Sequence, residues 1–384
     1  MKFDNIEYKF EIIEYSSLFD DVFNDIMKPA CKEVKHMMKN KRRTSSSGGS
    51  VKYRRRVFVL LILFLICFFV SFAIGLYGVP VPEVIKIFIS KILPIEHTWD
   101  SSMEIVVMNV RFPRIIAAGL IGGALAVSGG VYQGMFKNPM VSPDVLGTSA
   151  GAGFGAALGI LMGVGYAGIS LLSFGFGLLA VVIVCVISSK YKNNMAMGLI
   201  LAGIMMGSLF SAGTSFLKLV ADPTDQLPAI TYWLMGSLAS IRKEDLMLLV
   251  PVILLGMVPL FLLRWRLNVA TLADEEAMAL GVHIHRLRMG IIVCATLMTA
   301  VSVSVSGMIG WVGLVIPHFA RKFAGNDYKY LLPATILMGG SFLIMVDNLA
   351  RTLSTSEVPI GILTAFVGAP FFLYLLLKGG QSHA

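Results

Sequence analysis

Long runs of apolar residues dominate the chain, and short polar stretches separate them. Many windows reach roughly eighteen apolar residues, the length that a helix needs to cross a hydrocarbon core. The runs do not alternate as the strands of a membrane barrel would. We therefore expect an all-α polytopic membrane protein, because helices satisfy their own backbone in lipid. About ten spans are predicted: 57–78, 113–134, 145–164, 169–189, 195–218, 245–263, 287–307, 309–323, 331–350 and 358–377. The eighth is short, which favours a broken or partly re-entrant helix.

Small residues recur every four positions within three of these runs. Residues four apart share one face of a helix. Small side chains on that face let two helix backbones approach closely, which is how membrane helices associate. We interpret the stripes as packing surfaces, although they could also line the wall of a pathway. They are Ala118, Gly122, Ala126 and Gly130; Gly147, Gly151, Gly155, Gly159 and Gly163; and Gly203, Gly207, Ser211 and Ser215.

Composition agrees with a membrane protein. Of the 384 residues, 56% are hydrophobic and only 14% are charged, whereas about a quarter of a soluble domain is charged. The net charge of +9 is the usual excess of Lys and Arg beside membrane spans. Membrane lipid is therefore an expected partner, and no nucleic-acid partner is predicted.

The chain divides into two predicted regions. Residues 1–56 are polar and charged, with a TSSSGGS linker at 44–50, and we expect a weakly ordered cytosolic extension there. Residues 57–380 form the predicted transmembrane domain. No signal peptide fits, because the first long apolar run begins only near Val57.

Lysine and arginine counts predict the orientation of a multi-pass protein of the cytoplasmic membrane. A basic run at 52–56 precedes the first span, which places the N-terminus inside. Alternation then places three polar stretches inside, 190–194, 264–288 and 318–330, together with the C-terminus. All three carry Lys or Arg.

Three arginines are expected on the opposite, outer side. Arg111 and Arg114 come directly before the second span, and Arg351 ends the ninth. Basic residues are usually sparse on this side. The three arginines are either anchors for lipid headgroups or a docking patch for an acidic partner. Asp347 lies four residues before Arg351, so an i,i+4 ion pair is feasible.

Catalytic and energy-supplying motifs are missing from the chain. No GxxxxGK[ST] phosphate loop, nucleophile elbow or zinc motif occurs, so no cofactor or metal is predicted and any energy source is another subunit. No row of buried acidic residues or histidines crosses the membrane, which argues against the alternative of an ion-coupled secondary transporter of a small solute. An intramembrane enzyme is disfavoured, because no nucleophile and base are paired.

The loop 264–288 contains a short predicted helix, VATLADEEAMALGV. Asp274, Glu275 and Glu276 begin it, where carboxylates complement the helix dipole. Gly281 is placed to end it. Such a helix between two spans suits docking into a partner, although an ordinary loop helix is the alternative.

Several motifs together resemble the iron-siderophore, haem and vitamin B12 permeases of the FecCD type. They are RFPRIIAAGLIGGALAVSGGVYQGMFKNPMVSPDVLGTSAGA (111–152), WVGLVIPHFAR (311–321), DNLAR (347–351) and VPIGILTAFVGAPFFLYLLLK (358–378). The resemblance implies the vitamin B12-type (type II) ABC importer permease fold, with ten helices. It also implies a second permease subunit, more often as a homodimer than a heterodimer, two ATPase subunits, and an extracytoplasmic substrate-binding protein.

The resemblance assigns roles to three groups of residues. The arginines Arg111, Arg114 and Arg351 match those that dock the binding protein. The loop helix resembles the coupling helix that contacts the ATPase, with Thr271, Leu272, Asp274, Glu275, Glu276, Ala279, Leu280 and Gly281. The inner gate falls on Asn193, Asn194, Met195 and Ala196. Because Met195 and Ala196 are more apolar than the hydroxyl residues of the B12 permease, a ferric siderophore or haem is favoured over B12 as cargo.

Overall fold

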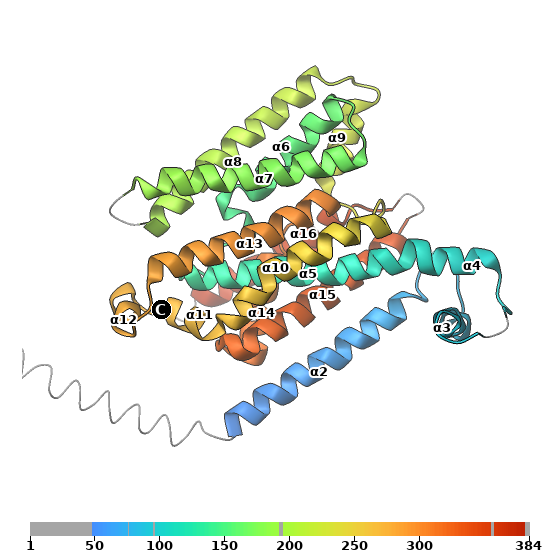
Figure 1. Ribbon diagram of the computed structural model, residues 1–384, viewed down its shortest axis with the longest axis horizontal. Coiled ribbons are helices and arrows are strands. Elements are labelled where there is room, and N and C mark those ends of the chain that lie inside the picture. Colours follow the sequence, from blue (N-terminus) through green and yellow to red (C-terminus); the bar gives the residue numbers. More distant parts are fainter. Residues whose placement is uncertain (1–47, 76, 95–96, 192–194, 355–356, 381–384) are drawn as a thin grey trace, which may run out of the picture. The chain divides into compact units, whose positions relative to one another are not determined.

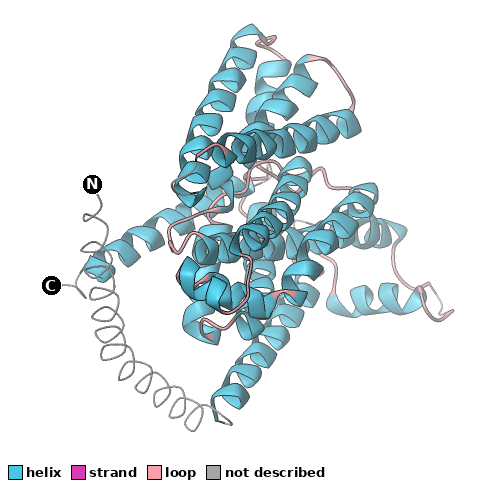
Figure 2. Cartoon of the chain, turned by 60° about the vertical axis from the view of Figure 1, so that its left-hand side comes forward, coloured by secondary structure: helices cyan, strands magenta, loops and turns pink. Residues whose placement is uncertain are grey.

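The computed structural model describes residues 48–75, 77–94, 97–191, 195–354 and 357–380, and Arg56–Ala384 form one compact unit. Every regular element in these ranges is a helix (Figure 2), which confirms the all-α prediction. The long helices, in chain order, are α2 (Gly48–Ser71), α5 (Phe112–Met135), α6 (Thr148–Leu161), α7 (Tyr166–Ser189), α8 (Met195–Val220), α10 (Lys243–Leu262), α13 (Ile284–Ser306), α14 (Val312–Ala324), α15 (Tyr328–Thr352) and α16 (Ile360–Gly380). Most of the predicted extension, residues 1–56, lies outside the described ranges, so this domain division stays a prediction.

Each predicted span is occupied by one of these helices. Six helical stretches within the described ranges are long and apolar enough to cross a membrane, and α6 and α16 are shorter apolar helices. The short eighth span is α14, which has 13 residues and contains Pro317. Short helices occupy parts of the connections: α3 (Val81–Ser90), α4 (Ser101–Ile105), η1 (Val106–Arg111), η2 (Pro143–Leu146), α9 (Gln226–Met235), α11 (Arg264–Ala270) and α12 (Asp274–Ala279).

Helix α5 is the centre of the packing. The most apolar window of its span is 83% buried, against 22% for α10. Helices α13, α14 and α15 pack along α5, while α6, α7 and α8 pack with one another (Figure 1). Large apolar side chains such as Leu209 and Leu255 are exposed on α8 and α10. These outer faces are suited to contact with lipid, as expected for membrane helices.

Glycines allow the closest helix contacts, as the stripes predict. A Cβ at Gly122 of α5 would lie 2.8 Å from Leu343 Cβ of α15, and one at Gly155 would lie 2.8 Å from the carbonyl carbon of Leu172. Gly207 and Gly163 face open space instead. Gly129, outside the predicted stripe, makes a closer approach: its Cβ would overlap the backbone of Gly313 on α14.

The substitution Gly129→Ala is expected to destabilise the fold by about 3 kcal/mol or more, because overpacking is costly when the obstacle is backbone. The new Cβ would stand 2.5 Å from the carbonyl carbon of Gly313. Gly290→Ala on α13 is the control, since nothing lies within 4 Å of its Cβ position. Denaturant unfolding in mixed micelles measures both variants. Equal stability of the two variants would contradict this account of the close contact between α5 and α14.

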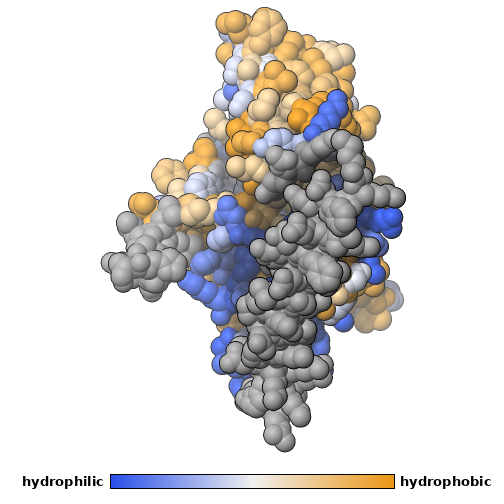
Figure 3. Space-filling view, turned by 90° about the vertical axis from the view of Figure 1, so that its left-hand side faces the viewer, coloured by the Kyte–Doolittle hydropathy of each residue, from blue (hydrophilic) through white to orange (hydrophobic). Residues whose placement is uncertain are grey.

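The helices bring two groups of polar residues to opposite ends of α5. We call the first the arginine end. It consists of Ser71, Arg111, Arg114, Asp347, Asn348, Arg351 and Glu357. Most of these side chains contact one another, and Asp347 and Asn348 are the central acceptors. We call the second the loop end: it holds the last turn of α5 with α11, α12 and the starts of α13 and α15. Figure 3 views the loop end, where hydrophilic residues gather beside a largely hydrophobic flank.

Candidate functional site

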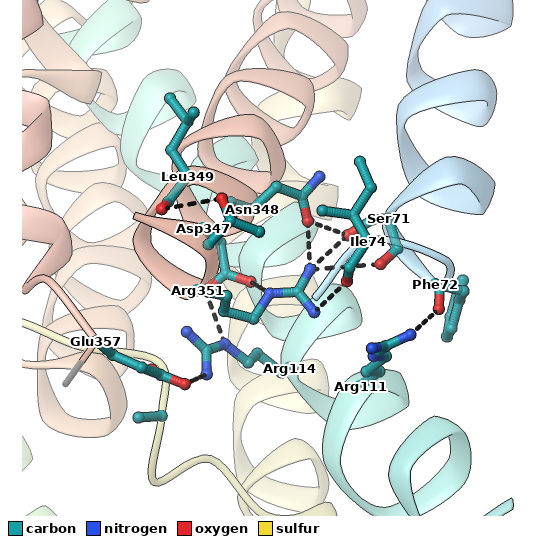
Figure 4. Close-up of polar contacts among 12 residues, drawn as sticks. Ser71, Phe72, Ile74, Arg111, Arg114, Asp347, Asn348, Leu349, Arg351 and Glu357 are labelled. Atoms are coloured by element: carbon teal, nitrogen blue, oxygen red, sulfur yellow. Dashed lines mark hydrogen bonds and ion pairs between the residues drawn. The ribbon is translucent and has the colours of Figure 1, made fainter. Parts of the chain in front are cut away.

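Arg114 lies in the first turn of α5 and is held by two carboxylates. Its Nε donates to Asp347 Oδ1 and its Nη1 to Glu357 Oε1, each at 2.8 Å (Figure 4). The Arg114 side chain is 3% exposed and the Asp347 side chain 1%. A charge can be buried this deeply when it is paired and hydrogen-bonded.

Arg351 lies on the other side of the same carboxylate. Its Nε is 3.2 Å from Asp347 Oδ2, an ion pair without hydrogen-bond geometry, so the predicted i,i+4 pair is confirmed. Its terminal nitrogens donate to Ser71 Oγ at 3.0 Å and to the carbonyl of Ile74 at 3.2 Å. Asp347 therefore lies between two guanidinium groups and joins α5 to α15 (Figure 4).

Arg111 completes the arginine end and caps the chain that leaves α2. Its terminal nitrogens donate to the carbonyl oxygens of Phe72 and Tyr77. Phe72 comes directly after the last residue of α2, where carbonyls have no partner within the helix, so this donor is stabilising. Gly75, at φ +154°, leaves room for the guanidinium: a Cβ there would lie 2.6 Å from Arg111 Nη2.

The three guanidinium groups thus lie together, and they are not exposed. Arg111 and Arg114 are 3% exposed and Arg351 6%, whereas the sequence suggests a surface patch. The acceptors that bury them come from distant parts of the chain: Glu357 is 243 residues from Arg114. The sequence contains one indication of this burial, which is Glu357. It is an acidic residue at the edge of the tenth predicted span, on the same predicted side as the arginines.

The arginine end is not fully paired. With three arginines and two carboxylates, its formal charge is +1. Arg114 Nη2 and Glu357 Oε2 are buried atoms without a hydrogen-bond partner. The side chain of Glu357 is 30% exposed, so it is the acidic group of this cluster that a partner can reach. Such an arrangement can exchange one carboxylate for another.

At the loop end, the predicted helix is confirmed as α12. Asp274, Glu275 and Glu276 form its first turn, and Gly281 follows it at φ +77°. Asp274 accepts from both terminal nitrogens of Arg288, at 2.9 and 2.7 Å, and lies 3.3 Å from Lys137 Nζ. Desolvation opposes ionisation, but the hydrogen bonds and charges of Arg288 and Lys137 outweigh it and hold the pKa of Asp274 below its ordinary value.

The outer surface of α12 is apolar as well as acidic. Ala277 is buried against the body of the protein, while Met278 and Leu280 are 56% and 54% exposed. The other predicted coupling residues are exposed or half-buried: Thr271, Leu272, Asp274, Glu275, Glu276, Ala279 and Gly281. An exposed apolar ridge on a short, pinned helix is suited to a groove on another protein.

The predicted gate is only partly described. Met195 begins α8, is half-buried, and its carbonyl accepts from Ser188 Oγ at 3.1 Å. Ala196, also half-buried, follows it. Asn193 and Asn194 lie outside the described residues, so the gate stays a prediction.

Comparison with known proteins gives one consistent result. The FecCD transport family model matches residues 62–378. The molybdate import permease MolB of Haemophilus influenzae is 41% identical, over 86% of this chain and 98% of the relative. A probable iron chelatin permease of Helicobacter pylori is 40% identical, over 72% and 84% respectively. A solved metal-chelate type ABC transporter in an inward-facing conformation is 38% identical, with a TM-score of 0.75, and covers 85% of this chain and 99% of its own.

Proposed function

This chain belongs to the FecCD transport family as the permease subunit of an ATP-driven importer, and we propose that its cargo is a metal carried in a complex. A ferric siderophore, haem or related chelate is the first candidate. The observation that carries this proposal is the similarity to the metal-chelate transporter, which extends over 99% of that chain. Molybdate is the second candidate, favoured by 41% identity to a molybdate permease.

Cargo is tested by transport into proteoliposomes that hold the permease and its cognate ATPase. Each cargo is presented with the cognate binding protein: a ferric siderophore, haem, cobalamin and molybdate. The proposal expects ATP-dependent uptake of one metal complex, and no uptake when the ATPase is left out. Uptake driven by an ion gradient without ATP would support a secondary carrier instead.

The proposed assembly contains two permeases, two ATPase subunits and one binding protein. A homodimer is favoured over a heterodimer, and both termini face the cytoplasm. The basic stretches 264–288 and 318–330 support this orientation, because they contribute to the loop end and Lys and Arg prefer the cytoplasmic side. Hydrolysis of ATP then belongs to the partner subunit.

Helix α12 is the proposed contact with the ATPase. Its exposed Met278 and Leu280 would enter the partner, while the Asp274–Arg288 pair ties its first turn to α13. Force on α12 would therefore reach a helix of the membrane domain. The inner gate near Met195 lies on the same proposed side.

The substitution Met278→Pro is expected to uncouple ATP hydrolysis from transport. Proline removes a helix hydrogen bond and costs about 3 kcal/mol in a helix interior, and α12 has only six residues. Met278→Leu is the control, because it keeps the helix and an exposed apolar side chain of similar size at this position. Uptake per ATP hydrolysed, measured in proteoliposomes, should fall at least about tenfold for the proline variant. Unchanged uptake in folded Met278→Pro protein would count against the coupling role.

The arginine end is the proposed docking site for the binding protein. The partly exposed side chain of Glu357 and the unused Arg114 Nη2 support exchange with an acidic side chain of a partner. Arginine suits this role because its planar fork can hold a carboxylate by two hydrogen bonds. Each permease of a dimer would offer one such cluster.

A further inference from the structure

A cavity at the loop end has a different chemistry from the sites above. Its volume is about 300 Å³, and it lies between the end of α5, the connection that follows it, α14 and the start of α15. Lys137, His318 and Arg321 line it, with polar side chains from Asn138, Asn326 and Thr271. No carboxylate is among its lining residues, all of which are described.

Arg321 is fixed in this cavity by neutral groups. Its Nη2 donates to the carbonyl of Gly130 at 3.1 Å, and its Nη1 donates to Gln133 Oε1. The amide of Gln133 is held in turn by the carbonyl of Leu314, at 3.1 Å, and Tyr328 OH also donates to Gly130, at 3.0 Å. Among the described residues no ion pair balances the charge of Arg321. The guanidinium is therefore pre-positioned with its charge uncompensated.

Two further side chains in the cavity, besides Arg321, can donate hydrogen bonds to a bound ligand. Lys137 stands at the edge of the cavity with a left-handed backbone, φ +52°, and its side chain is 40% exposed. Its one close carboxylate in the described structure is Asp274, which is already held by both terminal nitrogens of Arg288. Nε2 of His318 is buried without a hydrogen-bond partner. A neutral imidazole protonated on this nitrogen can donate there.

We propose that this cavity binds a small oxyanion. A tetrahedral oxyanion offers acceptors to the Arg321 fork, the Lys137 ammonium and the imidazole at once, and these charge-assisted hydrogen bonds are the strong ones. The volume is at the lower limit of ligand pockets, which suits a single phosphate-sized group. The group can be a free anion or the phosphate of a lipid headgroup, because both present the same oxygens.

Binding of an oxyanion in the cavity would also affect α12. Lys137 is shared between the cavity and Asp274, so a bound oxyanion competes with the first turn of α12 for this ammonium. This consequence rests on the coupling role proposed above, whereas the site itself does not. Binding to the permease alone therefore tests the site even if the coupling proposal fails.

Tungstate is the probe, because it is a tetrahedral dianion that can be titrated calorimetrically into the full-length chain in phosphate-free dodecyl maltoside micelles. We expect saturable binding that Arg321→Gln and Lys137→Gln each weaken by about tenfold, the size of one charge-assisted hydrogen bond. Lys322→Gln is the matched control: it removes the same charge one residue along α14 from an exposed side chain that does not line the cavity. Lys137→Gln keeps the test valid if Arg321→Gln misfolds. Binding that is absent, or equal in all four proteins, would overturn the proposal.

Competition identifies the source of the oxyanion. Displacement of tungstate by inorganic phosphate supports a free anion. Displacement by a short-chain phosphatidylglycerol, but not by phosphate, supports a lipid headgroup. If neither displaces it, the cavity does not accept a phosphate group, and a phosphate-sized ligand is ruled out.

Discussion

Replacing Asp347 with asparagine should lower the free energy of unfolding by about 3–5 kcal/mol, the cost of removing one partner from a buried ion pair. Asp347 is 1% exposed and contacts both Arg114 and Arg351. Without its charge two buried guanidinium groups face each other, and Glu357 alone remains to neutralise them. The cost follows from leaving these charges unpaired in an apolar surrounding.

Denaturant unfolding in mixed micelles provides the measurement, with expression in the membrane as a second readout. Asp225→Asn is the matched control, because Asp225 is exposed and its side chain makes no capping hydrogen bond at the start of α9. It should change stability by less than about 0.5 kcal/mol. A similarly small effect of Asp347→Asn would mean that the arginines do not depend on this carboxylate.

The membrane helices could be predicted from the sequence because their signal is local. Twenty or so apolar residues have few alternatives in lipid, so each of the ten segments contains a helix. The bounds were less predictable: α2 begins at Gly48, nine residues before the apolar run at 57. The basic run at 52–56 is polar but compatible with a helix, and hydropathy marks only where the membrane begins. Helix α3 was missed, although the spacing of Val81, Val84 and Ile87 is amphipathic and the last two are buried.

The candidate sites were predictable in part for the same reason. The acidic start and glycine stop of α12 are local capping signals, and the Asp347–Arg351 pair follows from helix periodicity. The burial of the arginines could not be predicted. It depends on Glu357 and on the carbonyls at the end of α2, which come to Arg114 and Arg111 only when distant segments pack. The same holds for the cavity at Arg321, which combines α5 with α14 and α15.

Burial also changes how docking has to be tested. A glutamate at Arg111 or Arg351 would place a carboxylate against backbone carbonyl oxygens, which cannot donate to it. Such variants are expected to fail in folding, so they cannot separate docking from headgroup anchoring. Glu357 is better placed for the test, because its side chain is 30% exposed, against 1% for Asp347, the other carboxylate on Arg114.

The substitution Glu357→Gln should strengthen association with the binding protein by about tenfold, which is ~1.4 kcal/mol. Two effects act in the same direction. The internal carboxylate no longer competes for Arg114 Nη1, and the formal charge of the arginine end rises from +1 to +2, which attracts an acidic partner more strongly. The gain should shrink as salt rises, because screening shortens the reach of exposed charges. Interferometry on permease held in lipid nanodiscs, at low and high salt, measures both.

Glu104→Gln is the matched control for this gain. Glu104 carries the same charge in the connection before α5, where it pairs with Lys91 and contacts neither Arg111 nor Arg114 in the described structure. If docking uses Arg114, the Glu357 variant gains affinity and the Glu104 variant gains much less. An equal gain in both would reduce the effect to general attraction between opposite charges. No gain in either would leave the arginines as anchors that hold α2, α5 and α15 together, because a partner that never takes the place of Glu357 has no other route to the buried guanidinium of Arg114.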